Sequence, residues 1–344
     1  MSGSYIIGSI KISELASVNV VAAQLDFRDF LGAVMVRWGI RRDRFRVNPG
    51  LYAIGTPDQS SDVFVTANYK LTFDNLRKNL AGINGWILVL DTKGINVWCA
   101  AGKGTFGTKE LVNRIRSVSL ENIISHKRII LPQLGATGVA AHKVKSETGF
   151  NVHYGPVRAS DIKQFIADGY RADKSMRRVT FGFADRLKLI PNDMIYGKYY
   201  LLGALAVFVF LSLVSGEGFA LNKLSEDGIK AIINVILAYI SGIVITPVLL
   251  PYIPARYFSL KGFFTGSLVF LFLFLIKFTG ENVFETISWF LIITAISSFL
   301  AMNFTGSSTY TSLSGVKKEM KFSLPVQIGF ATGSIILQII GKLI

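Results

Sequence analysis

The sequence predicts an α/β domain, residues 1–190, followed by an all-α transmembrane domain of five helices, residues 191–344. The first observation is that the 344-residue chain is 51% hydrophobic with a mean hydropathy of +0.44, which is too apolar for a wholly soluble protein. The second is the charge distribution. Residues 1–198 carry a net charge of +12, whereas residues 199–344 carry +3 and nearly all of the unbroken apolar sequence.

Cysteine and histidine usage excludes two classes of protein. Cys99 is the only cysteine, so no disulfide can form within the chain, and a disulfide-built secreted protein is excluded. The three histidines are scattered, without the spacing of a zinc site. The first twenty residues lack an apolar segment behind a basic one, so we expect no cleaved signal peptide.

From about Ser61, short β-rich runs alternate with amphipathic stretches. The predicted strands are residues 62–68, 86–91, 128–133 and 151–157, and the predicted helices are residues 73–82, 108–119, 138–149 and 159–169. This alternation predicts a mostly parallel sheet covered on both faces, a Rossmann-like arrangement. Ligands of such sheets bind beyond the carboxyl ends of the strands. The candidate ligand-binding turns are therefore Thr66-Ala67-Asn68-Tyr69, Asp91-Thr92-Lys93, Gln133-Leu134-Gly135 and Gly155-Pro156-Val157.

Five apolar blocks follow, each close to the ~20 residues that a helix needs to cross a bilayer. They are Tyr199–Val214, Ile229–Leu250, Phe258–Phe278, Phe284–Met302 and Leu324–Leu343. Their interiors hold Ser, Thr, Gly and Asn234 but no acid or histidine. Because buried ionisable residues mark most ion pathways, this composition favours an anchor or a docking surface.

Loop charge predicts the orientation of the five spans. Basic residues gather before the first span, between the second and third, and before the fifth, whereas the other two loops hold more acids than lysines. By the positive-inside rule, the N-terminal domain is cytoplasmic and the C-terminus lies outside, in a multi-pass protein of the cytoplasmic (inner) membrane. The basic residues are Arg186, Lys188 and Lys198, then Arg256 and Lys261, then Lys317, Lys318 and Lys321.

Gly102, Gly104 and Gly107 form a G-x-G-x-x-G pattern after a β-like run, which suggests a dinucleotide site. The acidic residue expected about 20 positions further on, at a strand end, is missing, because Glu121 comes too early. The pattern is therefore a weak indication of a nicotinamide or flavin site.

The segment Asn96–Lys103 carries the strongest chemical signal. A single cysteine between Trp and Ala is most often a small buried hydrophobe. Two features favour a function instead. The small residues Ala100, Ala101 and Gly102 leave room for a large flat group, and Lys103 places a positive charge one helical turn away, which favours a thiolate.

The run NVWCAAGK, followed by GTFGTKELVNRI, closely resembles the cap-helix signature of the membrane-bound mercury-methylating corrinoid proteins (HgcA-type). That family is related through its soluble domain to the corrinoid subunit of the carbon-monoxide-dehydrogenase/acetyl-CoA pathway. The segments PGLYAIGTPDQSSDVFVTANYKLTFDNLR, ILPQLGATGVAAH and NVHYGPVRASD also look like family sequence in family order. The resemblance covers most of the chain from about Trp38, and five membrane spans after a corrinoid domain match the family architecture.

The resemblance implies that Cys99 is the catalytic residue and the lower axial ligand of a cobalamin cobalt. His142 and His153 are not expected to bind cobalt. The turns at 66–69, 133–135 and 155–157 would hold the rest of the cofactor. The remaining implied cofactor-binding residues are Asn96, Val97, Trp98, Ala100, Ala101, Gly102, Lys103 and Thr105.

The implied activity is transfer of a methyl group from a methyl-folate, by way of a methyltransferase and the cobalt, to mercury(II), which gives methylmercury. A thiolate pushes electron density onto cobalt, so the methyl group becomes more carbanion-like and suits an electrophilic acceptor. The same donation makes cobalt harder to reduce. The family's electron donor, a ferredoxin-like protein with two [4Fe–4S] clusters, can have the low potential required.

Two other functions remain open at the level of the sequence. One is a membrane-anchored corrinoid one-carbon carrier of an acetyl-CoA-type pathway, with a different acceptor. The other is a membrane transporter or receptor with a nucleotide-binding domain. A cluster of arginines before the corrinoid-like region indicates attraction to anionic membrane lipids or docking of an acidic ferredoxin-like partner. No nucleic-acid recognition module is visible. The cluster consists of Arg37, Arg41, Arg42, Arg44 and Arg46.

Overall fold

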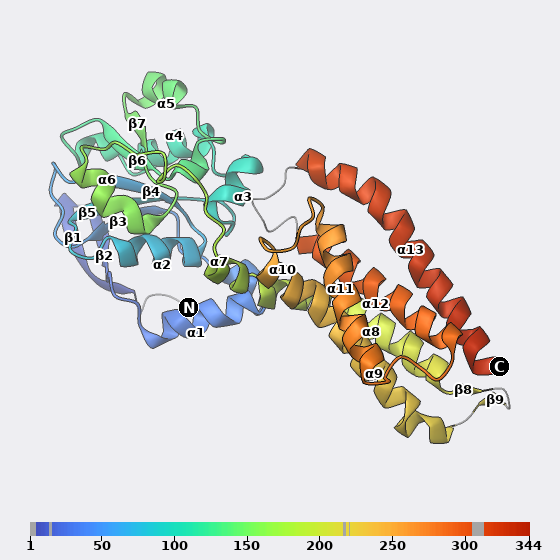
Figure 1. Ribbon diagram of the computed structural model, residues 1–344. Helices are drawn as coiled ribbons and strands as arrows, with labels where there is room; N and C mark the ends of the chain where they lie inside the picture. Colours follow the sequence, from blue (N-terminus) through green and yellow to red (C-terminus); the bar gives the residue numbers. More distant parts are fainter. Residues whose placement is uncertain (1–4, 14–15, 216–217, 220, 305–312) are drawn as a thin grey trace. The chain divides into compact units, whose positions relative to one another are not determined.

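The computed structural model describes all residues except 1–4, 14–15, 216–217, 220 and 305–312. The chain divides into two compact units, Met1–Thr180 and Phe181–Ile344 (Figure 1). The first is a mixed seven-stranded α/β unit, and the second holds five long apolar helices, which confirms the predicted fold class.

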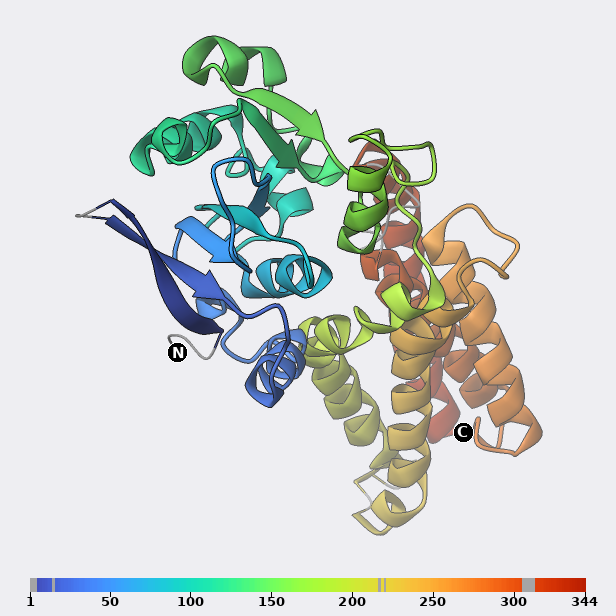
Figure 2. The same cartoon turned by 90° about the vertical axis from the view of Figure 1, so that its left-hand side faces the viewer.

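The sheet of the α/β unit has the strand order β1-β2-β3-β5-β4-β6-β7 (Figures 1 and 2). Strands β5, β4, β6 and β7 are parallel, as predicted, whereas β3 runs antiparallel to β5 and β1 antiparallel to β2. Phe64 pairs with Ile87 on one side and Ile130 on the other, so β4 lies within the parallel part. The strands are β1 (Ile6–Ser13), β2 (Ala16–Val21), β3 (Gly50–Ile54), β4 (Val63–Ala67), β5 (Gly85–Leu90), β6 (Arg128–Leu131) and β7 (Asn151–Tyr154).

Helices cover both faces of this sheet. α2 (Lys70–Asn79) and α6 (Ile162–Ala167) pack on the face that includes Phe64, and α3 (Val97–Gly102), α4 (Thr108–Ser117) and α5 (Ala141–Thr148) pack on the other. Every residue of β4 and β5 is buried, which is why these strands read as continuous apolar runs rather than alternating ones. The remaining elements are α1 (Phe27–Arg37) and the 3₁₀ turns η1 (Arg42–Arg44), η2 (Leu120–Asn122), η3 (Gln133–Gly135) and η4 (Ala159–Asp161).

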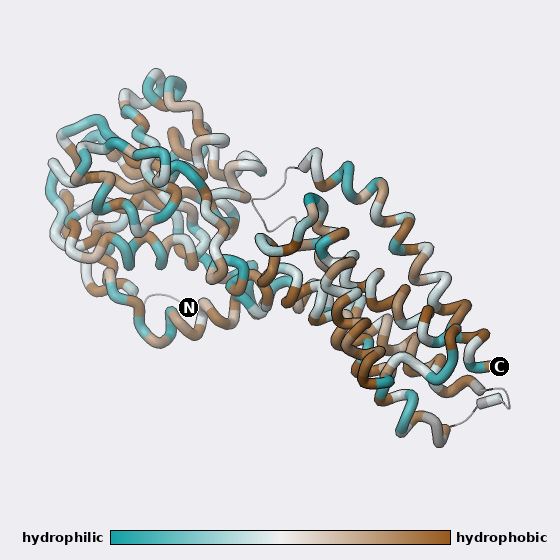
Figure 3. The backbone as a smooth tube through the Cα atoms, in the orientation of Figure 1, coloured by the Kyte–Doolittle hydropathy of each residue, from teal (hydrophilic) through white to brown (hydrophobic). Residues whose placement is uncertain are grey.

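The second unit has five helices that are long and apolar enough to cross a membrane, and each predicted span overlaps one of them. They are apolar along most of their length (Figure 3). The elements are α7 (Phe183–Leu187), α8 (Ile190–Ser212), β8 (Val214–Ser215), β9 (Gly218–Phe219), η5 (Leu221–Ser225), α9 (Asp227–Ile240), the π-helical turn η6 (Ser241–Ile245), α10 (Thr246–Leu249), α11 (Phe258–Leu275), α12 (Val283–Asn303) and α13 (Leu313–Leu343).

Small and hydroxylated residues hold the middle of this bundle together. A Cβ atom added to Gly262 of α11 would lie 2.5 Å from the Ser297 carbonyl oxygen of α12, so the two helix backbones are in close contact. Ser297 Oγ donates a hydrogen bond to the Gly262 carbonyl at 2.7 Å. We call the four buried residues Ser241, Thr246, Thr265 and Ser297 the hydroxyl seam, since their side chains are hydrogen-bonded to one another. Close packing at small residues with hydroxyl hydrogen bonds is typical of membrane helices.

The paired ionisable side chains Lys342, Asp227 and Glu285 lie near helix ends. Lys342 Nζ, near the end of α13, lies 2.7 Å from Asp227 Oδ2 and 3.0 Å from Glu285 Oε1, which belong to the first turns of α9 and α12. At the opposite end of α13, the buried Glu319 accepts a hydrogen bond from the Ser259 backbone N–H at 2.6 Å. These positions are compatible with helices that keep charge away from the middle of a bilayer.

Candidate functional site

The turns selected from the sequence lie at one edge of the sheet. Because β4, β5, β6 and β7 are parallel, their carboxyl ends meet there, and each predicted turn follows one of these strands. The turns are also joined directly. The Gln133 backbone N–H donates to the Pro156 carbonyl at 3.4 Å, and the Asn68 backbone N–H donates to the Leu90 carbonyl at 3.1 Å.

Asn68, at the end of β4, holds the loop that leads from β5 to α3. Its Oδ1 accepts hydrogen bonds from the Thr92 backbone N–H at 3.1 Å, the Thr92 hydroxyl at 2.9 Å and the Gly94 N–H at 2.9 Å. Its Nδ2 donates to Asp91 Oδ1 at 3.1 Å. Since Asn68 is fully buried and its amide is used in these bonds, it positions the loop rather than offering a surface to a ligand.

Helix α3 begins at Asn96, whose side-chain Oδ1 accepts a hydrogen bond from the Cys99 backbone N–H at 3.0 Å. This is the usual work of an asparagine N-cap, which satisfies a helix donor that has no partner within the helix. The residues before Gly102 are therefore helical, and the β-like interpretation of that run is wrong. The G-x-G-x-x-G pattern consequently lacks the strand that a dinucleotide fingerprint requires.

Helix α3 has one face in the core and one face outward. Val97, Ala100 and Ala101 belong to the hydrophobic core under the sheet. Trp98 is 44% exposed, and the nearby residues Cys99, Gly102 and Lys103 are exposed as well. Of the three small residues expected to leave room for a large group, Gly102 lies on the outward face, whereas Ala100 and Ala101 allow the helix to lie close to the core.

The inner side of α3 is tightly packed around Phe106, which is fully buried. A Cβ atom at Gly138 would lie 2.1 Å from the Phe106 carbonyl oxygen, and one at Gly135 would lie 2.5 Å from the Phe106 ring. A Cβ atom at Gly102, by contrast, would meet nothing within 4 Å. The site is thus rigid underneath and open on the face that carries Cys99.

A second feature at this edge also fits a bound ligand. Gln133 Oε1, in η3, is buried and has no hydrogen-bond partner among the described residues. Buried acceptors are normally satisfied, so this oxygen is suited to accept a hydrogen bond from a group that the protein chain does not supply. An amide-bearing cofactor is one such group.

The residues predicted to bind the cofactor separate into three groups by exposure. Exposed are Trp98, Cys99, Gly102 and Lys103. Half-buried are Asn96, Thr105, Gln133, Leu134 and Val157. Buried are Thr66, Ala67, Asn68, Tyr69, Val97, Ala100, Ala101, Gly135, Gly155 and Pro156. The first two groups offer accessible surface to a ligand, while the third group shapes the edge from below.

Two residues of this edge were not predicted. Phe106 fills the space under α3, and Glu110 of α4 accepts a hydrogen bond from the Asp91 backbone N–H at 2.9 Å. The spacing of Gly135 and Gly138 is the sequence signal that could have indicated a bulky neighbour here. At Asp91, burial alone would raise the carboxyl pKa, but the hydrogen bond and charge of Lys93 hold that pKa below its ordinary value.

Two of the histidines lie on α5 and β7. His142 is exposed on α5, and His153 of β7 lies edge-on to the Tyr170 ring at 6.2 Å. Burial and the nearby charge of Arg128 lower the His153 pKa below its ordinary value.

Residues 14–166 match the family model of the CO dehydrogenase/acetyl-CoA synthase delta subunit, which covers less than half of the chain. Over 166 residues the chain is 30% identical to the acetyl-CoA decarbonylase/synthase complex subunit gamma of Archaeoglobus fulgidus, or 47% of this chain and 35% of that protein. The α/β unit is related to these subunits.

Two further relatives match shorter stretches of the chain. The chain is 34% identical over 122 residues to the corrinoid/iron-sulfur protein large subunit of Moorella thermoacetica, or 35% of this chain and 27% of that protein. It is 32% identical over 127 residues to the subunit gamma of Methanopyrus kandleri, covering 36% and 27%. The chain thus spans about a third or less of the curated relatives' length. The relationship to the corrinoid subunit of the acetyl-CoA pathway is confirmed, while the mercury-methylating assignment stays a prediction.

Proposed function

We propose that this chain is a membrane-anchored corrinoid methyl carrier that methylates mercury(II), with the Cys99 thiolate as the lower axial ligand of cobalt. The observation that carries the proposal is the position of Cys99. The chain's one cysteine is exposed on the outward face of a short helix, near the candidate ligand-binding edge of a unit related to a corrinoid protein. A cysteine kept for packing would be buried instead.

Different residues around Cys99 would contact different parts of the cofactor. Trp98, Gly102 and Lys103 would lie against the corrin, and Gly102 in particular presents no side chain there. Corrin side chains carry amide N–H groups, so the unpartnered Gln133 Oε1 would accept a hydrogen bond from one of them. Asn68 and Asn96 would keep the loop and the helix in place beneath.

A bound corrinoid supplies a cobalt atom that accepts a methyl group and passes it to a second substrate. The Cys99 sulfur would donate electron density to that metal and favour an electrophilic acceptor such as mercury(II). We further propose a ferredoxin-like protein with two [4Fe–4S] clusters as the electron donor, and a methyl-folate, through a methyltransferase, as the methyl source. The spans would anchor the chain in the cytoplasmic membrane with the α/β unit on the cytoplasmic side.

A second candidate keeps the corrinoid and the membrane anchor but changes the acceptor. The relatives named as subunits of the acetyl-CoA decarbonylase/synthase complex favour it. On this alternative the chain is a one-carbon carrier for an acetyl-CoA-type pathway, and mercury(II) is not a substrate.

A single-turnover experiment under anaerobic conditions separates the two. The full chain is loaded with methylcobalamin, its absorption spectrum is recorded, mercury(II) is added, and methylmercury is measured over time. The Cys99→Ala variant is run in parallel. We expect rapid methylmercury formation and a thiolate-dependent cobalt spectrum in the wild type, and neither in the variant.

The control must account for direct binding of mercury(II) to the thiol. Cys99→Ala removes the chain's one thiol, so a Cys99→Ala/Ser146→Cys variant restores one on the exposed surface of α5. This variant should bind mercury(II) and still form no methylmercury. Wild-type activity in Cys99→Ala would refute the axial-thiolate mechanism. A thiolate-dependent spectrum without transfer to mercury(II) would favour the one-carbon carrier.

A further inference from the structure

Helix α1 exposes most of its large apolar side chains, although Val36 is buried, and it buries the charged Asp29. Phe27 is 75% exposed and Phe30 is 64% exposed, and Leu31 and Trp38 are exposed as well. Residues 27, 31, 34 and 38 follow helical spacing, so they form one stripe that runs along α1 and ends at its C-cap, Trp38. We call Phe27, Phe30, Leu31, Val34 and Trp38 the α1 stripe.

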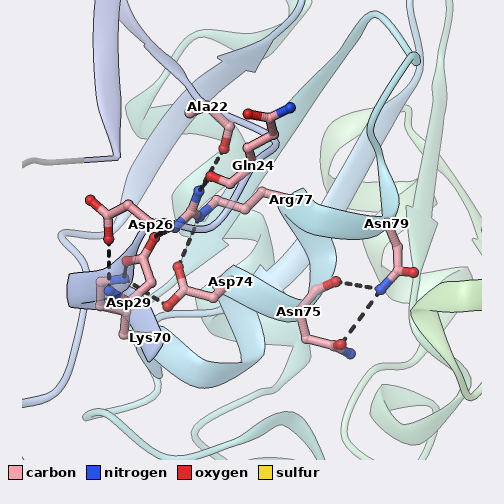
Figure 4. Close-up of polar contacts among 9 residues, drawn as sticks. All are labelled: Ala22, Gln24, Asp26, Asp29, Lys70, Asp74, Asn75, Arg77 and Asn79. Carbon is pink, nitrogen blue, oxygen red and sulfur yellow. Dashed lines mark hydrogen bonds and ion pairs between the residues drawn. The ribbon is translucent and has the colours of Figure 1, made fainter. Parts of the chain in front are cut away.

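The opposite side of α1 is fixed by a buried charge cluster (Figure 4). Asp29, which is 4% exposed, is paired with Arg77 and with Lys70 Nζ, the latter at 2.6 Å. Asp74 completes the cluster, at 2.7 Å from Lys70 and 2.8 Å from Arg77. Arg77 also donates to the carbonyl oxygens of Ala22 and Gln24, which both lie in the loop between β2 and α1.

This cluster holds α1 in its present rotation. Turning the helix to bury the α1 stripe would pull Asp29 away from Arg77 and Lys70. The two cations would then share the single carboxylate of Asp74, which is costly. Gly32 adds a second restraint, because a Cβ atom there would lie 2.7 Å from the Phe45 ring. The outward position of the phenylalanines is therefore built into the fold of the α/β unit.

Basic residues are concentrated in α1 and in the segment directly after it. Six arginines lie between residues 28 and 46, against two acids, one of which is the buried Asp29. Arg28, Arg41, Arg44 and Arg46 are exposed. Phenylalanine, leucine and tryptophan on one face with arginine around them is the composition of helices that lie in the plane of a membrane surface.

We propose that α1 is an in-plane membrane-binding helix, which inserts the α1 stripe into the headgroup layer of an anionic bilayer while its arginines bind lipid phosphates. Two observations favour lipid as the occupant. The arginines match the negative charge of phospholipid headgroups, and the same chain carries five helices long and apolar enough to cross a bilayer. A membrane surface is thus within reach of the α/β unit.

The proposal is tested in the full chain by depth-dependent fluorescence quenching. In a Cys99→Ser background, Phe30→Cys is labelled with the fluorophore NBD, and Ser146→Cys on the exposed face of α5 is the matched control. Each protein is reconstituted into vesicles of phosphatidylcholine and phosphatidylglycerol that contain nitroxide lipids. An in-plane helix buries its apolar face about 5–10 Å into the headgroup boundary, so a nitroxide near the headgroups should quench more than one at the acyl-chain end.

We expect NBD at position 30 to emit at a shorter wavelength and to lose most of its emission to the shallow nitroxide, and NBD at position 146 to do neither. Omitting phosphatidylglycerol, or introducing Arg41→Glu with Arg44→Glu, should weaken the quenching at position 30. Equal exposure of both positions to water would overturn the proposal. A wavelength shift at position 30 without nitroxide quenching would also overturn it, since the stripe would then be covered by protein. NBD at position 27 provides a second test if position 30 perturbs the helix.

Discussion

The Asn96 side chain is hydrogen-bonded to the backbone N–H of Cys99, three residues further along α3. The residue that starts the helix therefore also restrains the residue that we propose as the cobalt ligand. One layer below, Asn68 restrains the loop from which α3 emerges. Asn68 thus ties this loop to the end of β4, and Asn96 ties the end of the loop to the helix that carries Cys99.

Asn96→Ala should loosen α3 locally without unfolding the unit. Loss of an N-cap costs about 1 kcal/mol, which corresponds to about fivefold faster amide exchange by local opening. Hydrogen exchange with mass spectrometry on peptides covering residues 96–103 measures this change. Asn96→Asp keeps an oxygen at the same position and should exchange at close to the wild-type rate. Equal protection in the alanine variant would show that Asn96 does not restrain Cys99.

Asn68→Ala should destabilise the whole α/β unit. The substitution leaves the buried donors of Thr92 and Gly94 without an acceptor, at an expected cost of about 1–3 kcal/mol in the free energy of unfolding. Urea unfolding of the detergent-solubilised chain, followed by tryptophan fluorescence, measures it. Asn79, which is half-buried and whose side-chain amide donates to Asn75 one turn back (Figure 4), is the matched control. Asn79→Ala should change the same free energy by less than about 0.5 kcal/mol. A similar effect at the two positions would argue against the role given to Asn68.

Lys342→Met should weaken the helical bundle. The ammonium lies between Asp227 and Glu285, and removing it leaves two largely buried carboxylates without a cation. Breaking a buried ion pair from one side costs about 3–5 kcal/mol. Titration with SDS, with helix content followed by circular dichroism, gives the stability of the bundle.

Lys230→Met provides the comparison for this measurement. Lys230 pairs with Glu226, whose side chain is 71% exposed, so its loss should cost no more than about 1 kcal/mol. If the two variants lost the same stability, the three-residue contact at Lys342 would not be an important restraint on α9, α12 and α13.

The His153 side chain should titrate below its ordinary value of 6.5, because burial and the charge of Arg128 disfavour the protonated form. In the pH range below 6.5, the unfolded chain therefore binds more protons at this residue than the folded one. The stability that neutral His153 contributes is fully present above pH 6.5 and is lost as the pH falls toward its folded pKa. NMR of histidine ring carbons gives the pKa, and the signal missing in His153→Gln identifies the residue. A midpoint at or above 6.5 would contradict the prediction.

The central strands were predictable because their information is local. Each residue of β4 and β5 is buried on one face or the other, so an unbroken apolar run marks them without knowledge of their neighbours. Strands β1, β2 and β3 are different. They carry small and polar residues, and their place in the sheet depends on pairing with distant segments, such as Tyr52 of β3 with Ile87 of β5. No local pattern contains that pairing.

The candidate site shows the same division. The octet around Cys99 indicated which segments belong to the site. It did not indicate which face of α3 lies in the core and which face points outward. Six helical residues are less than two turns, too few for an apolar period to show which side is buried. In α1 the pattern is even reversed, because the pairing of Asp29 with Arg77 joins residues far apart in the sequence and turns the apolar side outward.

The hydroxyl seam makes the helices of the second unit resist separation. Its hydrogen bonds join η6, α10, α11 and α12, and Gly262 and Gly266 bring the backbones of α11 and α12 too close for any side chain to lie between them. Each such bond between membrane helices contributes about 0.6 kcal/mol, and several must break together before the helices can part. A metal ion could therefore pass between these helices only after the hydrogen bonds of the seam broke. With those bonds intact, the helices would act together as the membrane anchor of the α/β unit.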